Sequence, residues 1–594
     1  MVKYFLTVLT GLAVSVGLVF APGCQGPAAP TRVGRHGDRD VETGSALAAA
    51  SDRKGARVQF RRITVKDYVD KMKAGWIGQI AGVSWGAPTE FRFKGRIIPE
   101  DKMPKWQPKM INNAFGQDDI YVEMTFLRSL ELYGLDVSGR QVGIDFANSR
   151  YRLWHANNAG RENLRAGIAP PDSGHPEFNK HADDIDYQIE SDFAGLISPG
   201  LGGNAVALGE KFGRLMNYGD GLYGGQFVAG MYAEAFFETD SEKIILAGLK
   251  CIPQRSQYYE CINDVLKWYK ANPDDWQKTW QLIEDKYNRN PDYRRSSCSK
   301  EHNFNIDAKI NGAYIVMGLL YGRGDPDETT IIATRCGQDS DCNPSSAAGV
   351  LFTTIGFSKL PGKFTAELCH ETKFRFTAYN FGALTEVCEK LARQVVLRAG
   401  GRIEKNNLGE EVFVIPALPV KPGRLEQCFS PEPIANSRFT EDELAQIIEP
   451  RAIELSTEKF APGWKVINCG PDMDPGLHEQ LLGRKSVFVT HPLDRNTPCV
   501  LASKLEIPPA KKTVLQLVVG HHPEGDWTLI VKADGKELVR KSISKDNSTN
   551  GFLEADVDLS AYAGRTINVE LLNQPNGWHY EAAYWDKIKL AAQE

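Results

Sequence analysis

Apolar residues recur with a helical period from about residue 58 to residue 425. In GQDDIYVEMTFLRSLELYG (116–134), one face of a predicted helix carries Ile120, Met124, Leu127 and Leu130, and Gly134 is placed to end it. KINGAYIVMGLLYGRGD (309–325) and GGQFVAGMYAEAFFE (224–238) are apolar on nearly every side and rich in Gly and Ala. Such helices are usually buried, and their small residues permit close approach. The pattern predicts an all-α domain over 58–425.

The period changes after about residue 450, where strands are predicted. The strand candidates are TVLQLVVG (513–520), DWTLIVKADGKELVRKSI (526–543) and RTINVELLN (565–573). Asp534-Gly535 is predicted to form a hairpin turn, and Ile567, Val569 and Leu571 alternate with polar residues. We expect an all-β sandwich over 451–594. Residues 426–450, with prolines and the short helical piece TEDELAQII, are predicted to connect the two domains.

The first 24 residues are predicted to be an export signal and not part of the fold. They contain a basic start at Lys3, an apolar run and small residues before Cys24, as in a bacterial lipoprotein signal. The Leu that usually stands three residues before such a cysteine is absent, and an uncleaved anchor is the alternative. Residues 25–57 are rich in Ala, Gly, Pro, Arg and Asp and are predicted to be a flexible tether. We therefore expect a periplasmic, cell-surface or secreted protein, with membrane attachment only through Cys24.

The overall charge gives no reason to expect a nucleic-acid partner. The chain of 594 residues has a formal net charge of −5, with no basic excess to attract phosphates. Its length allows two or more domains with sizeable cores.

Two acidic motifs precede apolar helices. Asp118 and Asp119 open the first predicted helix, and Glu123 lies one turn further on the same face as Asp119. Asp339 and Asp341 precede Asn343 and Pro344, a good N-cap and first helical residue. Oxygen ligands of this kind suit one or two hard divalent cations, Mg²⁺ or Mn²⁺. Each motif taken alone is better explained as helix capping or turn chemistry, and only the two together favour a metal site.

Three segments together resemble the ADP-ribosylglycohydrolase family, which includes the dinitrogenase-reductase-activating glycohydrolase. They are GWIGQIAGVSWGAPTEF (75–91), GQDDIYVEM (116–124) and GQDSDCNPSSAAGVL (337–351), in the family's order, and the resemblance covers roughly residues 64–400. It implies an all-helical fold, a two-metal centre and hydrolysis of a glycosidic bond at the ribose of an ADP-ribosyl group.

The resemblance implies roles for individual residues. The positions that match the family's metal ligands are Asp118, Asp119, Asp339 and Asp341. Glu90 matches a glutamate that enters the site, with a surface or capping role as the alternative. Gln117 and Cys342 stand where the family usually has Thr; the amide oxygen of Gln117 can serve as a ligand, whereas a thiol is a poor ligand for a hard cation. Glu123 is a candidate to supply the metal-ligand oxygen that is lost where Cys342 replaces the family's Thr. Cys342 is instead a candidate for a disulfide with Cys336.

Other residues are predicted to line the site. In DYQIESDFAGLISPG (186–200), Glu190 and Asp192 form a polar patch, and Asp192, Glu90 and Glu123 are our catalytic candidates. The acid and base roles stay unassigned. The predicted substrate-binding residues are Tyr218, Asp220, Gly224, Gln338 and Asn343, although Asp220 is also a candidate helix cap.

The C-terminal region resembles galactose-binding-like carbohydrate modules of the jelly-roll type, on the segments DVDLSAYAGRTINVELL and YWDKIKL. Trp578 and Tyr580 are candidates for stacking on a sugar ring, with packing between the sheets as the alternative. For Trp585, packing is favoured. Among the cysteines, the pairs to test first are Cys251 with Cys261 and Cys469 with Cys499, and free thiols are the alternative.

The leading hypothesis is an exported, metal-dependent glycosyl hydrolase. Export favours a glycan or glycoconjugate as the substrate, whereas the resemblance favours an ADP-ribosyl group, so both stay open. A catalytically inactive carbohydrate-binding surface lipoprotein is the alternative, because Gln117 and Cys342 depart from the family pattern.

Overall fold

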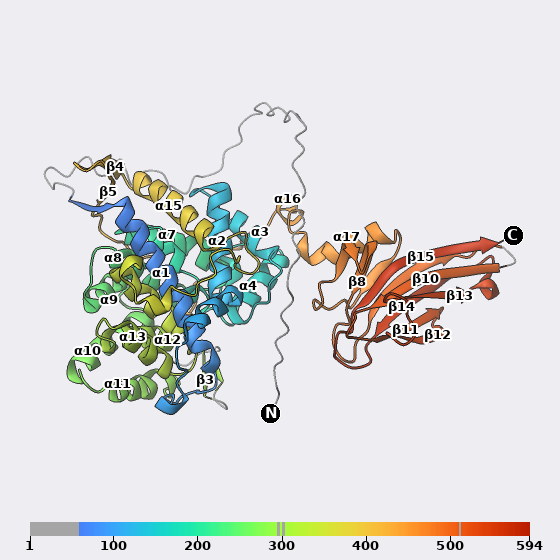
Figure 1. Ribbon diagram of the computed structural model, residues 1–594, viewed down its shortest axis with the longest axis horizontal. Helices are drawn as coiled ribbons and strands as arrows, with labels where there is room; N and C mark the ends of the chain where they lie inside the picture. The colour runs from blue at the N-terminus through green and yellow to red at the C-terminus, as the bar shows by residue number, and fades with distance from the viewer. Residues whose placement is uncertain (1–58, 294–297, 300–302, 510–511, 594) are drawn as a thin grey trace. The chain divides into compact units, whose positions relative to one another are not determined.

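The computed structural model describes residues 59–293, 298–299, 303–509 and 512–593 (Figure 1). The predicted signal, the tether and Cys24 lie outside the described residues. Within the described part, no helix combines the length and apolar composition needed to cross a lipid bilayer.

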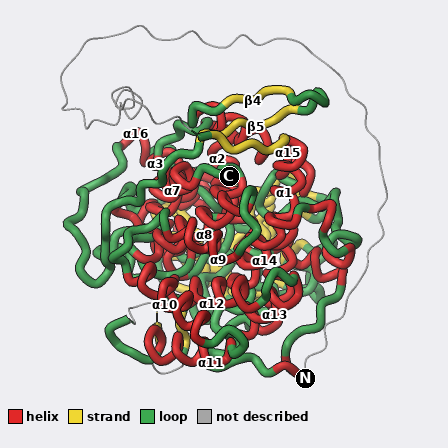
Figure 2. The backbone as a smooth tube through the Cα atoms, turned by 90° about the vertical axis from the view of Figure 1, so that its left-hand side faces the viewer, coloured by secondary structure: helices red, strands yellow, loops and turns green. Residues whose placement is uncertain are grey.

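The N-terminal part of the described chain is a cluster of helices with a three-stranded antiparallel sheet at its edge (Figure 2). Its α-helices are α1 (Val65–Gly86), α2 (Asp118–Tyr133), α3 (Gly139–Ala147), α4 (His155–Arg165), α5 (Asp186–Ile189), α6 (Asp192–Leu196), α7 (Gly202–Phe212), α8 (Asp220–Ala235), α9 (Ser241–Leu249), α10 (Gln257–Ala271), α11 (Trp276–Ile283), α12 (Ala308–Tyr321), α13 (Pro326–Arg335), α14 (Cys342–Ile355) and α15 (Phe381–Arg398). The strands of this part are β1 (Phe60–Thr64), β2 (Cys298–Ser299), β3 (Phe304–Asn305), β4 (Arg402–Lys405) and β5 (Glu411–Pro416).

The predicted helices are confirmed in α2, α8 and α12. Gly134 ends α2 with a positive φ of 80°, a conformation that glycine adopts without strain. Every residue of α12 is buried, and α8 exposes little beyond its two acidic residues, Asp220 and Glu234. Helices that are apolar all round therefore lie in the middle of the cluster, as their composition predicts.

A row of glycines brings α1 against α14. Gly78, Gly82 and Gly86 are spaced by one helical turn, and a Cβ atom on any of them would overlap backbone atoms of residues 340–349. The backbones can approach this closely because the glycines have no side chain. This packing sets the end of α1 against the loop that carries Asp339 and Asp341.

The edge sheet was not predicted. Its order is β1-β5-β4, with Phe60 opposite Pro416 and Arg402 opposite Val414. The helical pattern of the domain gave no sign of these strands, because EVFVIP is a short apolar run and such runs show no clear period. β5 is buried from Val412 to Pro416, and it contacts both α1 and α15.

The C-terminal region is all-β and antiparallel, as predicted. Its two five-stranded sheets have the orders β13-β10-β15-β8-β7 and β12-β11-β14-β9-β6. The strands are β6 (Lys465–Ile467), β7 (Gly476–Leu481), β8 (Arg484–Thr490), β9 (Cys499–Glu506), β10 (Lys512–His521), β11 (Trp527–Ala533), β12 (Lys536–Ile543), β13 (Phe552–Asp558), β14 (Thr566–Gln574) and β15 (Ala583–Gln593). Asp534 and Gly535 both have positive φ, as a tight hairpin turn requires. Trp527 and Trp585, from opposite sheets, pack with ring centroids 5.4 Å apart, so Trp585 is a core residue.

Residues 426–450 are held against the helical cluster. Phe439 and Ile447 are buried in its hydrophobic core. Arg140 Nε donates to a carboxylate oxygen of Glu443 at 2.7 Å, within the short helix α16 (Glu441–Leu444). Another helix, α17 (Ala452–Phe460), precedes the first strand of the β region. The change from helix to strand therefore comes about ten residues later than the sequence period indicated.

Candidate metal and active site

The first carboxylate pair lies at the start of α2. Asp118 is the first residue of α2, where burial raises the pKa of its carboxyl group and the nearby backbone N–H groups partly offset the rise. Asp119 is 3% exposed, and its Oδ1 has no hydrogen-bond partner among the described residues. The side chain of Gln117, which precedes them, makes no capping bond. A buried carboxylate oxygen without a partner is costly, so Asp119 has an oxygen available to a ligand.

The second pair lies at the start of α14. Asp341 is its N-cap residue, and Asp339 stands two residues earlier. The prediction of Asn343 as the N-cap was wrong, because the helix already begins at Cys342. Asn343 lies buried in the first turn, where its Nδ2 donates to Asn311 Oδ1 at 3.0 Å. This contact with α12 explains an asparagine inside the helix.

The two pairs meet in one buried cluster although they are far apart in the sequence. Burial, then the negative charges of Asp341 and Asp118, raises the pKa of Asp119 well above its ordinary value. Burial also raises the pKa of Asp339 to about 8, and burial together with Asp339 raises that of Asp341. Ligand atoms of Asp339, Asp341 and Cys342 all lie within 4.8 Å of one another.

Glu90 borders this cluster because its segment is tied to the second acidic loop. Thr89 Oγ1 lies 2.9 Å from Ser340 Oγ, and Phe91 N donates to the backbone oxygen of Gln338 at 3.0 Å. Glu90 itself is solvent-accessible, yet partial desolvation of its carboxyl group and the charge of Asp118 raise its pKa. A carboxylate at the open edge of a buried acidic cluster can reach both solvent and a bound molecule.

Two further carboxylates approach the cluster: Glu190, which was predicted to line the site, and Asp186, which was not predicted. Asp186 Oδ1 accepts the backbone N–H of Asn157 at 2.8 Å, and Asn157 Nδ2 donates to Glu190 Oε1. Burial raises the pKa of Asp186 to about 7 and the pKa of Glu190 well above its usual range. The negative charge of Asp118 raises both pKa values further. Their segment, DYQIE, was recognised as polar, but only the fold places it beside Asp118.

The donor set fits a hard divalent cation. Asp119 Oδ1 and Asp339 Oδ1 are both buried without a partner among the described residues. Carboxylate oxygens in this number suit Mg²⁺ or Mn²⁺, which would also offset their mutual repulsion. The thiol of Cys342 lies inside the same cluster, where burial and the charge of Asp119 raise its pKa, so it stays protonated. It is the one soft group among the residues described in this cluster.

Comparison with known proteins identifies the family of the helical part. The family description ADP-ribosylglycohydrolase matches residues 64–402, more than half of the chain. The chain belongs to the ADP-ribosylglycohydrolase family. All the acidic residues described above lie within the matched range.

Solved structures give weaker similarities. A chain of an ADP-ribosylglycohydrolase-related protein complex is 14% identical, with 56% of this chain and 99% of that chain covered, at a TM-score of 0.35. A CBM35 module from Paenibacillus barcinonensis is 10% identical over 22% of this chain and 94% of its own, at 0.17. A CBM61 structure in complex with beta-1,4-galactotriose is 16% identical over 22% and 84%, at 0.14. TM-scores below 0.5 do not establish a shared fold. No curated protein matches the chain.

Glu123 and Asp192 lie together within the family domain, and both are fully buried. Glu123 accepts hydrogen bonds from Gln79 Nε2 and, at 2.7 Å, from the backbone N–H of Phe193. Asp192 lies beside Tyr232 and Gln79, and both of its oxygens lack a well-formed hydrogen bond from any described residue. Burial raises its pKa to about 7. The two carboxyl groups therefore form a second buried acidic pair, in which burial and then the charge of Asp192 raise the pKa of Glu123.

The predicted substrate residues Tyr218, Asp220 and Gly224 have other contacts. Tyr218 Oη accepts the backbone N–H of Glu432 at 3.0 Å. Asp220 Oδ1 accepts the backbone N–H of Tyr258, and its Oδ2 lies 3.4 Å from Lys309 Nζ. A Cβ on Gly224 would touch the side chain of Gln188 at 2.6 Å, so this glycine serves packing. We do not carry these three residues into the proposed site.

Gln338 is buried next to Asp339, with φ of 56°. Its Oε1 accepts the backbone N–H of Asn305 at 3.0 Å, and its Nε2 donates to the backbone oxygen of Asn303 at 2.8 Å. With both side-chain groups engaged, Gln338 shapes the loops around the site.

The two aromatic candidates of the β region lie in one loop. Tyr580 is 36% exposed and stacks on His522 with ring centroids 4.4 Å apart. Trp578 is half-buried with its ring near the edge of His491. Glu581 holds the loop by accepting the backbone N–H groups of Asn576 and Gly577, each at 2.8 Å.

The structure has Cys251, Cys261, Cys336 and Cys342 as free thiols, so the pairings of Cys251 with Cys261 and of Cys342 with Cys336 are wrong for this structure. Cys251 faces Gly202 and Cys261 faces Lys309. Cys469 and Cys499 do lie side by side, within hydrogen-bond contact.

Proposed function

We propose that this member of the ADP-ribosylglycohydrolase family is an exported hydrolase that cleaves a glycosidic bond with the help of Mg²⁺ or Mn²⁺. The observation that carries the proposal is the meeting of Asp118 and Asp119 with Asp339 and Asp341 in one buried cluster. Separate helix caps would have no reason to converge from two distant helices.

The four aspartates would hold one or two ions, with Gln117 at the edge of the set. When bound, the ions would attract sugar hydroxyl oxygens and lower the pKa of a water molecule. Glu90 stands at the open edge and is the best placed to exchange a proton with solvent or substrate. Glu190 and Asp186, both with raised pKa values, are further proton carriers beside Asp118.

The substrate is a molecule with a sugar whose glycosidic bond can reach the cluster. Family membership favours an ADP-ribosyl group. The predicted export signal and the aromatic loop with Trp578 and Tyr580 favour a glycan or glycoconjugate instead. In this proposal the β region binds larger glycans and takes no part in the bond cleavage.

The test of the metal centre is Asp119→Asn, measured with and without Mg²⁺ or Mn²⁺. We expect the variant to lose turnover, and metal to raise the melting temperature of the wild type only. The matched control is Asp240→Asn, because Asp240 is a true cap that accepts backbone N–H groups in α9. An active Asp119→Asn protein and a metal-independent melt of the wild type would refute the proposal.

A catalytically inactive binding protein is the second candidate, and the thiol of Cys342 in the cluster is the observation that favours it. Screening against ADP-ribosyl-arginine, ADP-ribosyl-serine and a panel of aryl glycosides decides between the two. Turnover that Asp119→Asn abolishes supports the hydrolase. Glycan binding by the full chain, with no turnover and no metal uptake, supports the binder.

A further inference from the structure

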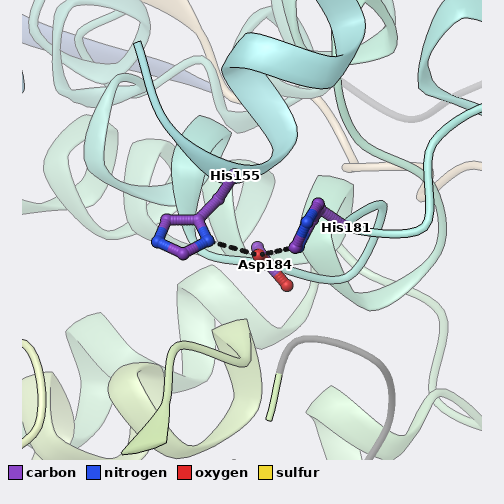
Figure 3. Close-up of side chains that lie close together, drawn as sticks. All are labelled: His155, His181 and Asp184. Atoms are coloured by element: carbon purple, nitrogen blue, oxygen red, sulfur yellow. Dashed lines mark hydrogen bonds and ion pairs between the residues drawn. The ribbon is translucent and has the colours of Figure 1, made fainter. Parts of the chain in front are cut away.

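A second group of metal-ligand side chains lies outside the carboxylate cluster. Figure 3 shows His155 and His181 with both imidazole rings directed at the carboxylate of Asp184. The Nδ1 atom of His181 is 3.0 Å from Asp184 Oδ2, and the Nδ1 atom of His155 is 3.7 Å from the same oxygen. The ligand atoms of all three residues lie within 4.8 Å of one another.

These separations match the spacing of ligands around a small ion. Zinc binds imidazole nitrogen and carboxylate oxygen at roughly 2.0–2.2 Å, so the edges of its ligand tetrahedron are about 3.3–3.5 Å long. The two separations from Asp184 bracket this length. Only small movements of the rings would be needed to place an ion among the three atoms.

The side chain of one residue, Asn179, holds the backbone at or next to both histidines. Asn179 is fully buried; its Oδ1 accepts the backbone N–H of His181 at 3.0 Å, and its Nδ2 donates to the backbone oxygen of Ala156 at 3.0 Å, next to His155. The backbone oxygen of Asp184 accepts Asn217 Nδ2 at 2.9 Å. Hydrogen bonds of this kind orient the residues that bind metals.

His155 is held in a strained backbone conformation. It is the first residue of α4, with φ of 42°, a region that residues other than glycine rarely occupy. Backbone strain of this kind is concentrated at functional sites. Here it turns the ring toward Asp184 and against Phe304, whose ring centroid is 5.7 Å away.

We propose that His155, His181 and Asp184 bind a borderline divalent transition-metal ion, with zinc as the preferred ion. This site differs in chemistry from the carboxylate cluster, since imidazole nitrogen suits zinc and carboxylate oxygen alone suits Mg²⁺ or Mn²⁺. Three protein ligands leave a fourth position open, as in zinc sites that bind a water or a ligand oxygen. The side chains of His155 and His181 are 33% and 23% exposed, so that position is accessible to solvent.

The experiment titrates the full chain, purified without a polyhistidine tag, with Zn²⁺ in the presence of excess Mg²⁺. Co²⁺ is a second probe, because its visible absorption reports nitrogen ligation and low coordination number. The variants are His155→Ala and His181→Gln. The glutamine keeps a side-chain N–H that can reach Asp184, so a merely structural hydrogen bond survives while the metal ligand is lost.

Two controls identify the site. His370→Ala removes an exposed histidine that packs on Phe381, and Cys342→Ser removes the thiol of the carboxylate cluster. We expect one tight Zn²⁺ site in the wild type and both controls, and at least about tenfold weaker binding in His155→Ala and His181→Gln. Melting curves of the zinc-free proteins, with circular dichroism, establish that each variant is folded.

Tight Zn²⁺ binding that survives in either histidine variant, or that disappears in Cys342→Ser, overturns the proposal. So does a wild type with no tight Zn²⁺ site. Because Asp119→Asn leaves His155, His181 and Asp184 intact, it should still bind Zn²⁺. The failure of this inference and the failure of the proposed function are therefore distinguishable.

Discussion

A methyl group added at Gly86 should disturb the candidate metal centre through the backbone. The Cβ atom of Gly86→Ala would lie 2.6 Å from Asp341 Cα, and closer still to the backbone oxygen of Ser340. Ordinary contact begins at 3.4 Å and the Ser340 oxygen lies at 2.0 Å, so the loop that carries Asp341 must shift by up to about 1.4 Å. Both obstacles are backbone atoms, and no side-chain rotation can relieve the overlap.

The size of the effect follows from two opposing contributions. Overpacking of this kind typically costs about 1–3 kcal/mol, and the better helix propensity of alanine returns at most about 1 kcal/mol. We expect a loss of about 1–2 kcal/mol, which lowers the melting temperature by a few degrees at most in a domain of this size. Metal–ligand distances tolerate only about 0.2 Å, so the affinity for Mn²⁺ should fall at least about tenfold.

Differential scanning calorimetry and Mn²⁺ titration by isothermal calorimetry measure the two quantities. The control is Gly203→Ala in α7, where a Cβ meets nothing within 4 Å. This substitution should leave Mn²⁺ affinity unchanged and raise stability slightly. If Gly86→Ala melted and bound Mn²⁺ like the wild type, the argument that α1 holds the second acidic loop in place would be refuted.

Three further predictions concern other parts of the chain. Burial raises the pKa of Asp192 to about 7, so the folded metal-free protein binds the proton of this carboxyl group more tightly than the unfolded chain does. The protein therefore loses stability as pH rises from about 4 to about 7. Asp192→Asn should raise the melting temperature at pH 8 but not at pH 4, and an equal shift at both pH values would contradict this. Cys469 and Cys499 should form a disulfide under oxidising conditions, and non-reducing peptide maps would detect it. By loop closure it should add about 3–4 kcal/mol to the free energy of unfolding, and Cys469→Ser should remove this gain. A chain of residues 58–450 should fold and bind Mn²⁺. A chain of residues 58–425 should have a lower melting temperature in calorimetry, because it lacks the buried Phe439 and Ile447. Equal melting temperatures would argue against a stabilising role of residues 426–450.

The sequence alone was enough for the features that depend on local pattern. The helical period in residues 116–134 predicted α2 and its end at Gly134, and the alternation of Ile567, Val569 and Leu571 predicted β14. These predictions succeeded because the periods of 3.6 and 2 residues reflect which face of an element is buried. The three motifs also led to the family, because their order along the chain is itself sequence information.

The tertiary structure decided which side chains share a site. Nothing local distinguishes Glu190, beside Asp118, from Asp192, which lies two residues further along the chain and beside Glu123. Likewise Asp220 has the sequence context of a site residue, yet Lys309 from α12 engages its carboxylate. The grouping of His155, His181 and Asp184 requires the turn of α4 to pack against a loop more than twenty residues away. A side chain's partners depend on the packing of distant segments, and the pattern of a single segment carries no information about them.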